Sequence, residues 1–406
     1  MLDVEEQLVI LRRGVDQVVP EAEFLGKLTR SVREGRPLRV KYGIDPTGIS
    51  VHLGHTVPLR KLRQFQELGH TAVVIIGNYT ALVGDPSGRD ETRAKLTEVQ
   101  VAANARDYLA QVGKIVDLTR AEVHLNGDWF SKWSFLQVLD LTRQMTLGQI
   151  SARDDFAKRI AAEKPVYLHE CLYPLMQGWD SVEIRADVEL GGTEQLFSLL
   201  VARDLQASQG QSPQVALTLP ILVGTDGVRR MGKSLGNYIG VADDPNNMFG
   251  KLMSIPDEAM RQYFTLLTDV PLEDVGRLLE GGTNPRDVKE VLGKAIVTQY
   301  WGAEQAEGAA AEFRRRRERL DPLEVPEATI AADQLDADGR IAASRLIVLL
   351  RFESSTSNAR RVIEQGGVNV GPERTPVTDP KAVLAVGDGL IVRVGKRKIA
   401  RVVVQG

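Results

Sequence analysis

Two histidines, His52 and His55, stand three positions apart in the stretch VHLGH, where an extended apolar segment gives way to an amphipathic run. The spacing of the apolar residues that follow predicts a helix that ends near Leu68, with Gly69 as its stop. Free backbone N–H groups and the dipole make a helix N-terminus an anion site, and Gly54 lets a large anion approach. Imidazoles there can donate hydrogen bonds to phosphate oxygens as charge accumulates on them. Taken alone, the pattern also fits one capping and one exposed histidine.

A second candidate for phosphate chemistry is the glycine-rich, cationic stretch GTDGVRRMGKSLGNYIG, residues 224–240. Arg230, Lys233 and Ser234 would present donors on a loop, and a cationic loop suits a polyphosphate that is held only transiently. The stretch lacks the GxxxxGK[ST] arrangement after a strand, which argues against the P-loop of kinases and ATPases. A surface turn with incidental charge is the alternative interpretation.

The elements that must position these motifs fall into four regions. Residues 1–245 alternate β-rich runs with helical periods, which predicts an α/β fold with a mainly parallel sheet and with the loop 224–240 near its end. Residues 246–322 show helical periods only, residues 323–340 read as a linker, and residues 341–406 predict a small α+β domain. In an open parallel sheet, function is expected at the carboxyl ends of the strands.

Composition narrows the class of protein. The chain has 406 residues, of which 43% are hydrophobic and 26% charged, as in ordinary globular proteins. One cysteine, Cys171, excludes a disulfide within the chain and fits a reducing compartment. The acidic start MLDVEEQ does not resemble a signal peptide, and no apolar run approaches the ~20 residues that cross a bilayer. We therefore expect a soluble, cytoplasmic protein.

Charge is distributed unevenly along the chain. The formal net charge is −3, yet residues 340–406 hold twelve Lys or Arg against five Asp or Glu, so the remainder is acidic. This asymmetry predicts a polyanionic partner at the C-terminal end. A basic surface that only aids solubility would give the same count.

Together, HLGH near the first helix and RMGKS about 180 residues later resemble the paired signatures of class I aminoacyl-tRNA synthetases. The stretches KYGIDPTG, VGDPSGR, LYPLMQGWDSV and ADVELGGTEQ extend the likeness to bacterial tyrosyl-tRNA synthetases with a long C-terminal domain. The likeness covers essentially the whole chain. It implies a Rossmann-like nucleotide-binding catalytic domain in 1–245, an α-helical anticodon-recognition domain in 246–322, and in 341–406 an RNA-binding domain of a ribosomal-protein type.

The resemblance also implies the reaction. ATP would activate L-tyrosine to tyrosyl-adenylate with release of pyrophosphate, and the tyrosyl group would then pass to the 3′ end of tRNA(Tyr) with release of AMP. The attacking carboxylate is already ionised, so the step needs no general base and depends on positioning and charge stabilisation. Mg²⁺ would accompany ATP, and no cluster of protein ligands predicts a permanent metal.

A polar stripe suggests where the amino acid binds. Tyr173, Gln177 and Asp180 recur at i, i+4 and i+7, so they line one face of a helix as either a solvated face or a binding surface. The resemblance favours binding, with Tyr173, Gln177 and Asp85 at the α-ammonium group and Asp180 at the phenolic hydroxyl. It assigns Thr47, His52, His55, Arg230 and Lys233 to catalysis, Gln195 and Tyr42 to tyrosine, Asp45, Gly54, Gly191, Gly192, Glu194, Met231 and Ser234 to ATP, and Arg360, Arg361, Lys396, Arg397 and Lys398 to tRNA.

Several positions depart from the family pattern, including Gly232 and Arg230, which replace the first serine and the first lysine of the usual loop motif. Lys41 stands where the family often has a tyrosine that contacts the substrate hydroxyl, and Tyr42 is shifted by one, which reverses the face of a strand. Glu194 replaces the usual aspartate, and Trp179 replaces a tyrosine beside the Asp180 position. These departures leave open a preference for a tyrosine analogue.

Two alternatives to a tyrosine enzyme remain. A synthetase for tryptophan shares the fold, although its usual form lacks the C-terminal domain. A synthetase-derived RNA-binding or regulatory protein without catalysis is the other, and the intact motifs argue against it. The resemblance further implies a homodimer formed through roughly residues 125–165.

Overall fold

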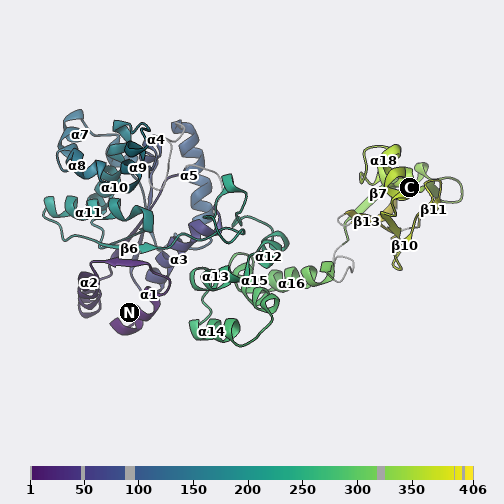
Figure 1. Cartoon of the computed structure of the whole chain (residues 1–406), viewed down its shortest axis with the longest axis horizontal. Coiled ribbons are helices and arrows are strands. Elements are labelled where there is room, and N and C mark those ends of the chain that lie inside the picture. Colours follow the sequence, from purple (N-terminus) through teal and green to yellow (C-terminus); the bar gives the residue numbers. More distant parts are fainter. Residues whose placement is uncertain are drawn as a thin grey trace. The chain divides into compact units, whose positions relative to one another are not determined.

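The computed structural model describes residues 2–46, 51–86, 97–317, 325–387, 389–395 and 398–405 (Figure 1). The chain divides into two compact units, Met1–Ala310 and Ala311–Gly406. Thr47, Lys396 and Arg397, which are among the predicted site residues, lie outside the described residues.

Unit 1 is built on a six-stranded sheet in the order β1-β6-β5-β2-β3-β4. All strands run parallel except β1, which pairs antiparallel with β6. The helices α2, α3 and α11 pack against the sheet, and β6 is buried along its whole length, as a covered parallel strand must be. This confirms the predicted parallel α/β architecture. The strands are β1 (Gln17–Val19), β2 (Arg39–Ile44), β3 (Thr71–Ile76), β4 (Glu122–Leu125), β5 (Val188–Gly192) and β6 (Val215–Leu219).

The strand order reverses between β2 and β5. From β2 the chain proceeds outward through β3 to β4, whereas β5 and β6 are added on the other side of β2. Loops at the carboxyl ends of two such strands diverge and leave a crevice, which is where ligands bind in open α/β sheets. The segments that follow β2 and β5 therefore mark the expected site.

Helices account for most of the rest of unit 1. The predicted helix after HLGH is α3, which begins at Leu53, ends at Glu67, and is followed by Gly69 in the left-handed region with φ 93°. The remaining helices up to the sheet's end are α1 (Val4–Arg12), α2 (Glu21–Glu34), α4 (Thr80–Val83), α5 (Glu98–Val112), α6 (Gly127–Phe130), α7 (Phe135–Thr142), α8 (Leu147–Ser151), α9 (Asp154–Ala161), α10 (Leu168–Ile184) and α11 (Leu196–Ser208). The helical region that follows contains α12 (Pro245–Met253), α13 (Met260–Leu267), α14 (Leu272–Glu280), α15 (Pro285–Trp301) and α16 (Ala303–Arg317).

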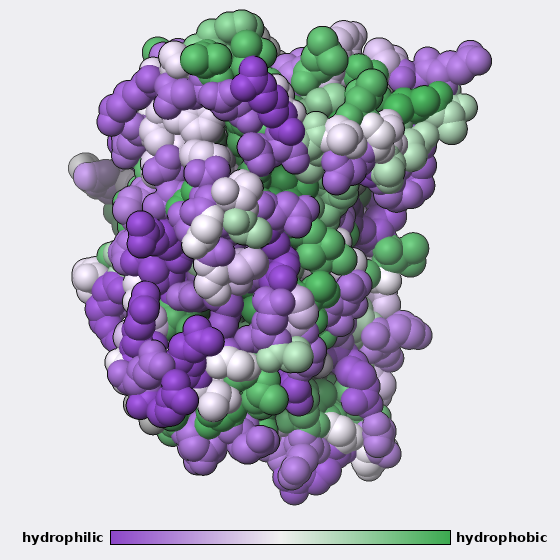
Figure 2. Space-filling model, turned by 90° about the vertical axis from the view of Figure 1, so that its left-hand side faces the viewer, coloured by the Kyte–Doolittle hydropathy of each residue, from purple (hydrophilic) through white to green (hydrophobic). Residues whose placement is uncertain are grey.

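The helices α7 to α10 carry hydrophobic side chains that face solvent. Figure 2 views unit 1 from the left-hand side of Figure 1, and it shows hydrophobic surface along the upper edge of this face. Clustered apolar exposure of this kind marks interaction surfaces in proteins. The large hydrophobic side chains that are exposed in this part of the chain are Phe135, Leu136, Leu139, Leu147, Ile160, Tyr167 and Leu168.

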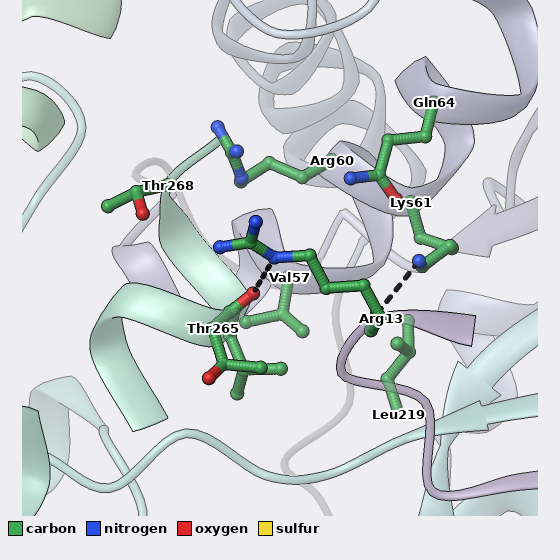
Figure 3. Close-up of a pocket in the computed structure, with 9 residues that line it drawn as sticks. Arg13, Val57, Arg60, Lys61, Gln64, Leu219, Thr265 and Thr268 are labelled. Atoms are coloured by element: carbon green, nitrogen blue, oxygen red, sulfur yellow. Dashed lines mark hydrogen bonds between the residues drawn. The ribbon is translucent and has the colours of Figure 1, made fainter. Parts of the chain in front are cut away.

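Cationic side chains tie α3 to the end of α1. Figure 3 shows Arg13, Arg60 and Lys61 around a small cavity between α3 and α13. The buried Lys61 ammonium donates to the backbone carbonyls of Leu11 and Arg13, at 2.9 Å each, and of Ile10 at 3.3 Å. A cation is favourable there because the last carbonyls of a helix carry partial negative charge.

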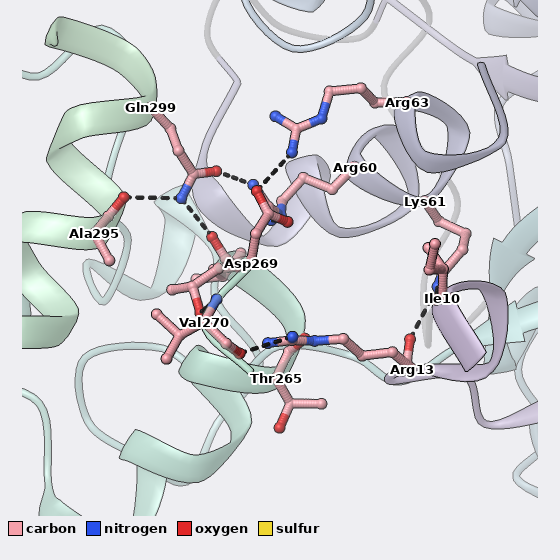
Figure 4. Close-up of polar contacts among 12 residues, drawn as sticks. Ile10, Arg13, Arg60, Lys61, Arg63, Thr265, Asp269, Val270, Ala295 and Gln299 are labelled. Carbon is pink, nitrogen blue, oxygen red and sulfur yellow. Dashed lines mark hydrogen bonds and ion pairs between the residues drawn. The ribbon is translucent and has the colours of Figure 1, made fainter. Parts of the chain in front are cut away.

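The same cluster ties α3 and α1 to the helical region. The Arg13 guanidinium donates to the backbone carbonyls of Phe264 (2.9 Å) and Val270 (2.8 Å) at the end of α13 (Figure 4). Arg60 of α3 donates to Asp269 at 2.6 Å and to Gln299 of α15. The helix that begins with the histidine motif is therefore held near its middle by charge-assisted hydrogen bonds, the stronger class of hydrogen bond.

Unit 2 is a small α+β fold with its own core. A five-stranded sheet has the order β10-β9-β12-β13-β7, and β8 pairs with β11. Apolar side chains of this sheet pack against α17 and α18. The elements are β7 (Glu327–Ala331), β8 (Arg340–Ala342), α17 (Ala343–Leu349), α18 (Thr356–Glu364), β9 (Val368–Val370), β10 (Thr375–Pro376), β11 (Val383–Ala385), β12 (Ile391–Val394) and β13 (Lys398–Gln405).

The stretch predicted as a linker, residues 323–340, is partly structured. From Glu327 to Ala331 it forms β7, which pairs in parallel with β13, and Ile330 is buried in the core of unit 2. The prolines and acidic residues of this stretch are typical of a linker. The backbone hydrogen bonds that make part of it a strand come from β13, which lies some 70 residues later in the sequence. The C-terminal fold thus begins upstream of the predicted boundary at 341.

Among the described residues, no helix is both long and apolar enough to span a membrane.

Candidate active site

Residues 51–53, which lead into α3, are paired with residues 239–241, which follow the cationic loop. The Leu53 N–H donates to the carbonyl of Ile239 at 2.9 Å, and the Val241 N–H donates to the carbonyl of Val51 at 3.0 Å. These bonds form an antiparallel bridge at His52. Two motifs that are far apart in the sequence are therefore joined through their backbones.

The two histidines sit at the N-terminus of α3, as predicted. His52 is the N-cap residue, and its backbone N–H donates to Nδ1 of His55 at 3.3 Å. The rings stack with centroids 3.7 Å apart. A Cβ on Gly54 would lie 3.1 Å from the His52 ring and 3.5 Å from Cβ of Met231, so glycine gives the close approach that the stacked rings need. His52 is buried and His55 is half-buried, so neither is the exposed histidine of the alternative interpretation.

Burial decides the charge of His52. Desolvation, and then the positive charge of Lys233, lower its pKa to about 4, so the ring is neutral at physiological pH. Its Nδ1 atom is buried and has no hydrogen-bond partner in the described part of the chain. A buried polar atom of this kind is expected to be satisfied by a ligand or water. The imidazole is thus available as a neutral hydrogen-bonding group.

The cationic loop is organised by Asn237, which sequence reasoning missed. Its Nδ2 donates to Asp226 Oδ2 at 2.9 Å and to the carbonyl of Arg230 at 3.1 Å, and its Oδ1 accepts the Gly232 N–H at 2.9 Å. Asn237 is buried. The signal in the sequence was an asparagine directly after a glycine in a loop, where such side chains fold the backbone. The side chains that were predicted to bind phosphates remain exposed around this scaffold: Arg230, Lys233 and Ser234.

Glycines line the end of β5. A Cβ on Gly191 would lie 2.9 Å from Leu199 Cδ1, and one on Gly192 would lie 2.4 Å from Glu194 Oε2, so both positions need glycine or a shifted neighbour. The Gly192 N–H donates to Gln195 Oε1 at 2.9 Å. Desolvation and then Asp85 raise the pKa of Glu194, while Arg230 opposes the shift. The structure thus brings residues predicted for ATP and for tyrosine to one edge of the sheet.

Asp180 lies on the buried face of α10 and accepts two hydrogen bonds. The indole Nε1 of Trp129 donates to its Oδ1 at 3.0 Å, and Asn126 Nδ2 donates to its Oδ2 at 3.3 Å. Burial raises the pKa of Asp180 to about 7, while the charge of Lys41 opposes the shift. Sequence reasoning missed Asn126 and Trp129. They lie three residues apart, Asn126 directly after β4 and Trp129 in α6, and only the fold brings this segment against α10.

A chain of hydrogen bonds connects the Asp180 region to the segment after β2. Asn126 Nδ2 also donates to Thr80 Oγ1 at 3.0 Å, Thr80 donates to Asp45 Oδ1 at 2.8 Å, and the Tyr173 hydroxyl donates to Asp45 Oδ2 at 3.0 Å. Gln195 Nε2 reaches Asp85 Oδ2 at 3.4 Å. Two residues of the polar stripe, Tyr173 and Asp180, are therefore in one network with Asp45, which was predicted to contact ATP.

Tyr42 does not face Asp180, although it was among the predicted tyrosine contacts. Neighbouring residues of a strand point to opposite faces, and Lys41 is the one that points toward α10. Burial raises the pKa of Tyr42, and Tyr108 and Glu194 add to the shift, so these are its charged or polar neighbours. The structure separates Tyr42 from the carboxylate that was predicted to bind the phenol.

The predicted tRNA-binding side chains belong to unit 2. Arg360 and Arg361 are exposed on α18, and Lys398 forms an ion pair with Glu353 at 2.8 Å. Arg360 and Arg361 thus present their guanidinium groups to solvent, whereas Lys398 is already engaged. Among the described residues, no group of three or more His, Cys, Asp or Glu side chains could hold a metal ion.

Comparisons with known proteins give one family. Residues 33–317 match the model of the class I tRNA synthetases for tryptophan and tyrosine. A tyrosine–tRNA ligase of Moorella thermoacetica is 48% identical over 404 residues, which are 98% of this chain and 96% of the relative. One of Symbiobacterium thermophilum is 48% identical over 412 residues, covering 100% of this chain and 99% of the relative. A tyrosine–tRNA ligase of Bordetella avium is 45% identical over 404 residues, which are 98% and 97% of the two chains.

Solved structures agree on the fold. A C-terminally truncated mitochondrial tyrosyl-tRNA synthetase of Aspergillus nidulans superposes with a TM-score of 0.64 at 22% identity, covering 78% of this chain and 94% of that one. A tyrosyl-tRNA synthetase of Archaeoglobus fulgidus, solved with L-tyrosine, gives 0.61 at 23% identity and covers 76% of this chain and all of that one.

Proposed function

The chain belongs to the tyrosine–tRNA ligases of the class I tRNA synthetases, and we propose that its active site lies at the carboxyl ends of β2 and β5, where the chain proceeds in opposite directions. There it would join L-tyrosine to ATP with release of pyrophosphate and then transfer the tyrosyl group to the 3′ end of tRNA(Tyr). The observation that carries this assignment is the backbone pairing of residues 51–53 with residues 239–241. It supports a single phosphate site made from both motifs.

At the phosphate end, the histidine motif and the cationic loop would act on the same group. The neutral His52, together with His55, donates hydrogen bonds as charge builds on the α-phosphate, and Lys233 and Arg230 neutralise the departing pyrophosphate. The exposure of both cations supports this role, because a loop can close over a ligand only with side chains that are not already buried. Thr47 is proposed to take part on the strength of the resemblance alone.

At the tyrosine end, the site would bind both the phenolic hydroxyl and the α-ammonium group of the substrate. Asp180 accepts a hydrogen bond from the phenolic hydroxyl, which phenylalanine cannot supply, and a buried carboxylate that lacks this hydrogen bond penalises that competitor. Gln177 Oε1 is buried and has no partner among the residues that the structure describes, so it offers an acceptor to the α-ammonium group together with Asp85 and Tyr173. A substrate with one donor at each end satisfies this arrangement.

The ATP site would extend from Asp45 to the end of β5. Asp45 lies along the ribose, the backbone at Gly191 and Gly192 admits the adenosine, and Glu194 takes the place of the usual aspartate at the ribose. ATP is a substrate of the class, and we propose that Mg²⁺ enters with it on its phosphates. The neutralising protein groups are then the loop cations and the N-terminus of α3.

Unit 2 would hold the tRNA. Its basic side chains, Arg360 and Arg361 among them, suit the phosphate backbone, which gives affinity without sequence readout. The all-α region 246–322 would recognise the anticodon, and residues 341–406 would bind RNA. Because both substrates, ATP and tRNA, are cytoplasmic, we propose the cytoplasm as the site of action.

The protein is proposed to work as a homodimer. The exposed hydrophobic side chains of α7 to α10, such as Leu136, Leu147 and Leu168, fall in or next to the expected interface at residues 125–165. A symmetric interface uses the same surface on both subunits, so one such surface is enough.

The experiment that tests the function is ATP–pyrophosphate exchange with each of the twenty amino acids and with 3-substituted tyrosines. Exchange that depends on L-tyrosine, followed by charging of tRNA(Tyr), is the expected result. Tryptophan-dependent exchange would support the synthetase for tryptophan, and exchange with none of these compounds would support a protein without catalysis. Preference for a substituted tyrosine would indicate that the departures at Lys41, Trp179 and Glu194 change which amino acid the site prefers.

A further inference from the structure

A buried ion pair lies beneath the tyrosine site. Lys41, in the middle of β2, and Glu189, in β5, are 0% and 1% exposed, and Nζ lies 2.9 Å from Oε1. Removing two charges from water costs several kcal/mol per ion, and an apolar pair of similar volume is often as stable. Stability alone therefore gives no reason for this pair at the centre of a sheet.

The contacts of the pair lead to α10. The Lys41 ammonium donates to the backbone carbonyl of Gln177 at 2.7 Å and to Ser181 Oγ at 2.8 Å. Glu189 accepts from Ser181 Oγ at 3.0 Å. These contacts grip α10 at positions 177 and 181, on either side of Asp180 along the helix. The three donors of the ammonium group are thus all used, by Gln177, Ser181 and Glu189.

Glu189 also fixes the orientation of the Gln177 carboxamide. Gln177 Nε2 donates to Glu189 Oε1 at 3.1 Å, while Gln177 Oε1 is buried without a partner in the described chain. A carboxylate can only accept, so the amide must turn its NH₂ toward Glu189 and its oxygen away from it. The oxygen is then left as an acceptor for a cation such as an α-ammonium group.

We propose that Lys41 and Glu189 are a positioning pair that sets the polarity of both ends of the tyrosine site. Lys41 holds the turn of α10 that carries Asp180, and its positive charge favours the carboxylate form that accepts from the phenolic hydroxyl. Glu189 keeps the Gln177 oxygen turned toward the α-ammonium group. This inference rests on the proposed function, and it assigns Lys41 a role that differs from that of the tyrosine usual at this position.

Electrostatics give the two residues opposite effects on Asp180. Burial raises the pKa of Asp180, Lys41 lowers it, and Glu189 raises it, while Asn126 and Trp129 favour the ionised form by donating to it. Removing the charge of Lys41 therefore favours the protonated acid. Removing the charge of Glu189 favours the carboxylate but frees the Gln177 amide to turn over.

The test compares Lys41→Met, Glu189→Gln and the double variant with the wild type in tyrosine-dependent pyrophosphate exchange. For Lys41→Met, we expect the acidic limb of kcat/KM for tyrosine to move up by about one pH unit, and discrimination against phenylalanine at pH 7 to fall about tenfold. For Glu189→Gln, we expect a higher KM for tyrosine and a tyrosine-to-phenylalanine ratio that does not fall, because both substrates carry the ammonium group and loss of the Glu189 charge favours the Asp180 carboxylate. The KM for ATP should stay within about twofold in each variant.

The double variant Lys41→Met/Glu189→Gln separates positioning from stability. It leaves no unpaired buried charge, so its unfolding midpoint should return toward the wild-type value while the raised tyrosine KM persists. If Lys41→Met does not fold, this variant carries the test through its KM and phenylalanine ratio. A folded Lys41→Met with an unchanged acidic limb and ratio would overturn the proposal, as would equal losses for tyrosine and ATP. Wild type that shows no tyrosine-dependent exchange would instead refute the proposed function.

Discussion

Replacing Lys233 with alanine should slow adenylate formation while leaving tyrosine binding and the fold almost unchanged. Lys233 is exposed, and the hydrogen bonds that shape its loop run through Asn237. Exposed substitutions away from such scaffolds usually change the free energy of unfolding by no more than about 0.5 kcal/mol. The effect on the reaction is therefore separable from any effect on stability.

The size of the effect follows from where Lys233 would act. A unit charge about 4 Å from a phosphate oxygen is worth about 4 kcal/mol at an effective dielectric constant of about 20. Loss of one preorganised donor to a transition state typically costs about 100-fold to 1,000-fold in kcat. We expect a decrease in that range, with the Kd for tyrosine within about twofold, because the contact is made mainly after the charge has moved.

The assay is single-turnover formation of tyrosyl-adenylate, alongside tyrosine binding measured by calorimetry. Arg229→Ala is the matched control, because Arg229 is a cation of the same loop whose guanidinium is already paired with Asp226 at 2.9 Å. It should change the rate little and stability by at most about 1 kcal/mol. Parallel losses of tyrosine affinity and rate in Lys233→Ala, or an equal rate loss in Arg229→Ala, would refute the reasoning.

Three further predictions concern the rest of the chain. A protein ending near Val325 should keep tyrosine-dependent pyrophosphate exchange but charge tRNA poorly and with a shallower salt dependence, because fewer phosphates are neutralised; an unchanged tRNA KM and salt slope would contradict it. Burial lowers the pKa of His70 to about 4 from 6.5, so the unfolded chain binds this proton first and stability should fall by up to about 3 kcal/mol as pH drops through that interval. In urea titrations His70→Gln should flatten that slope, and an unaltered slope would assign it to other groups. Light scattering should report about twice 44.7 kDa for the wild type and a smaller mass for Leu147→Asp, whereas a fully active wild-type monomer would exclude the dimer.

Local patterns in the sequence determined the fold class and predicted the chemistry of the phosphate motifs. The period of apolar residues after HLGH located α3 and its end at Gly69, because helical periodicity and a left-handed glycine are properties of a few neighbouring residues. The i, i+4, i+7 stripe on α10 predicted which side chains share a face for the same reason. The linker prediction failed for β7, whose pairing partner β13 lies far along the chain.

The tertiary structure alone decided which side chains of the candidate site are hydrogen-bond or ion-pair partners. The donors to Asp180 come from Asn126 and Trp129 on a different segment, and the partner of Lys41 is Glu189 on a strand that is distant in sequence. Strand order and register bring such groups together, and both depend on how whole faces pack rather than on local propensity. A residue's type and neighbours in sequence thus fixed what it could do, whereas its charge state and partners followed from the surfaces that folding buried around it.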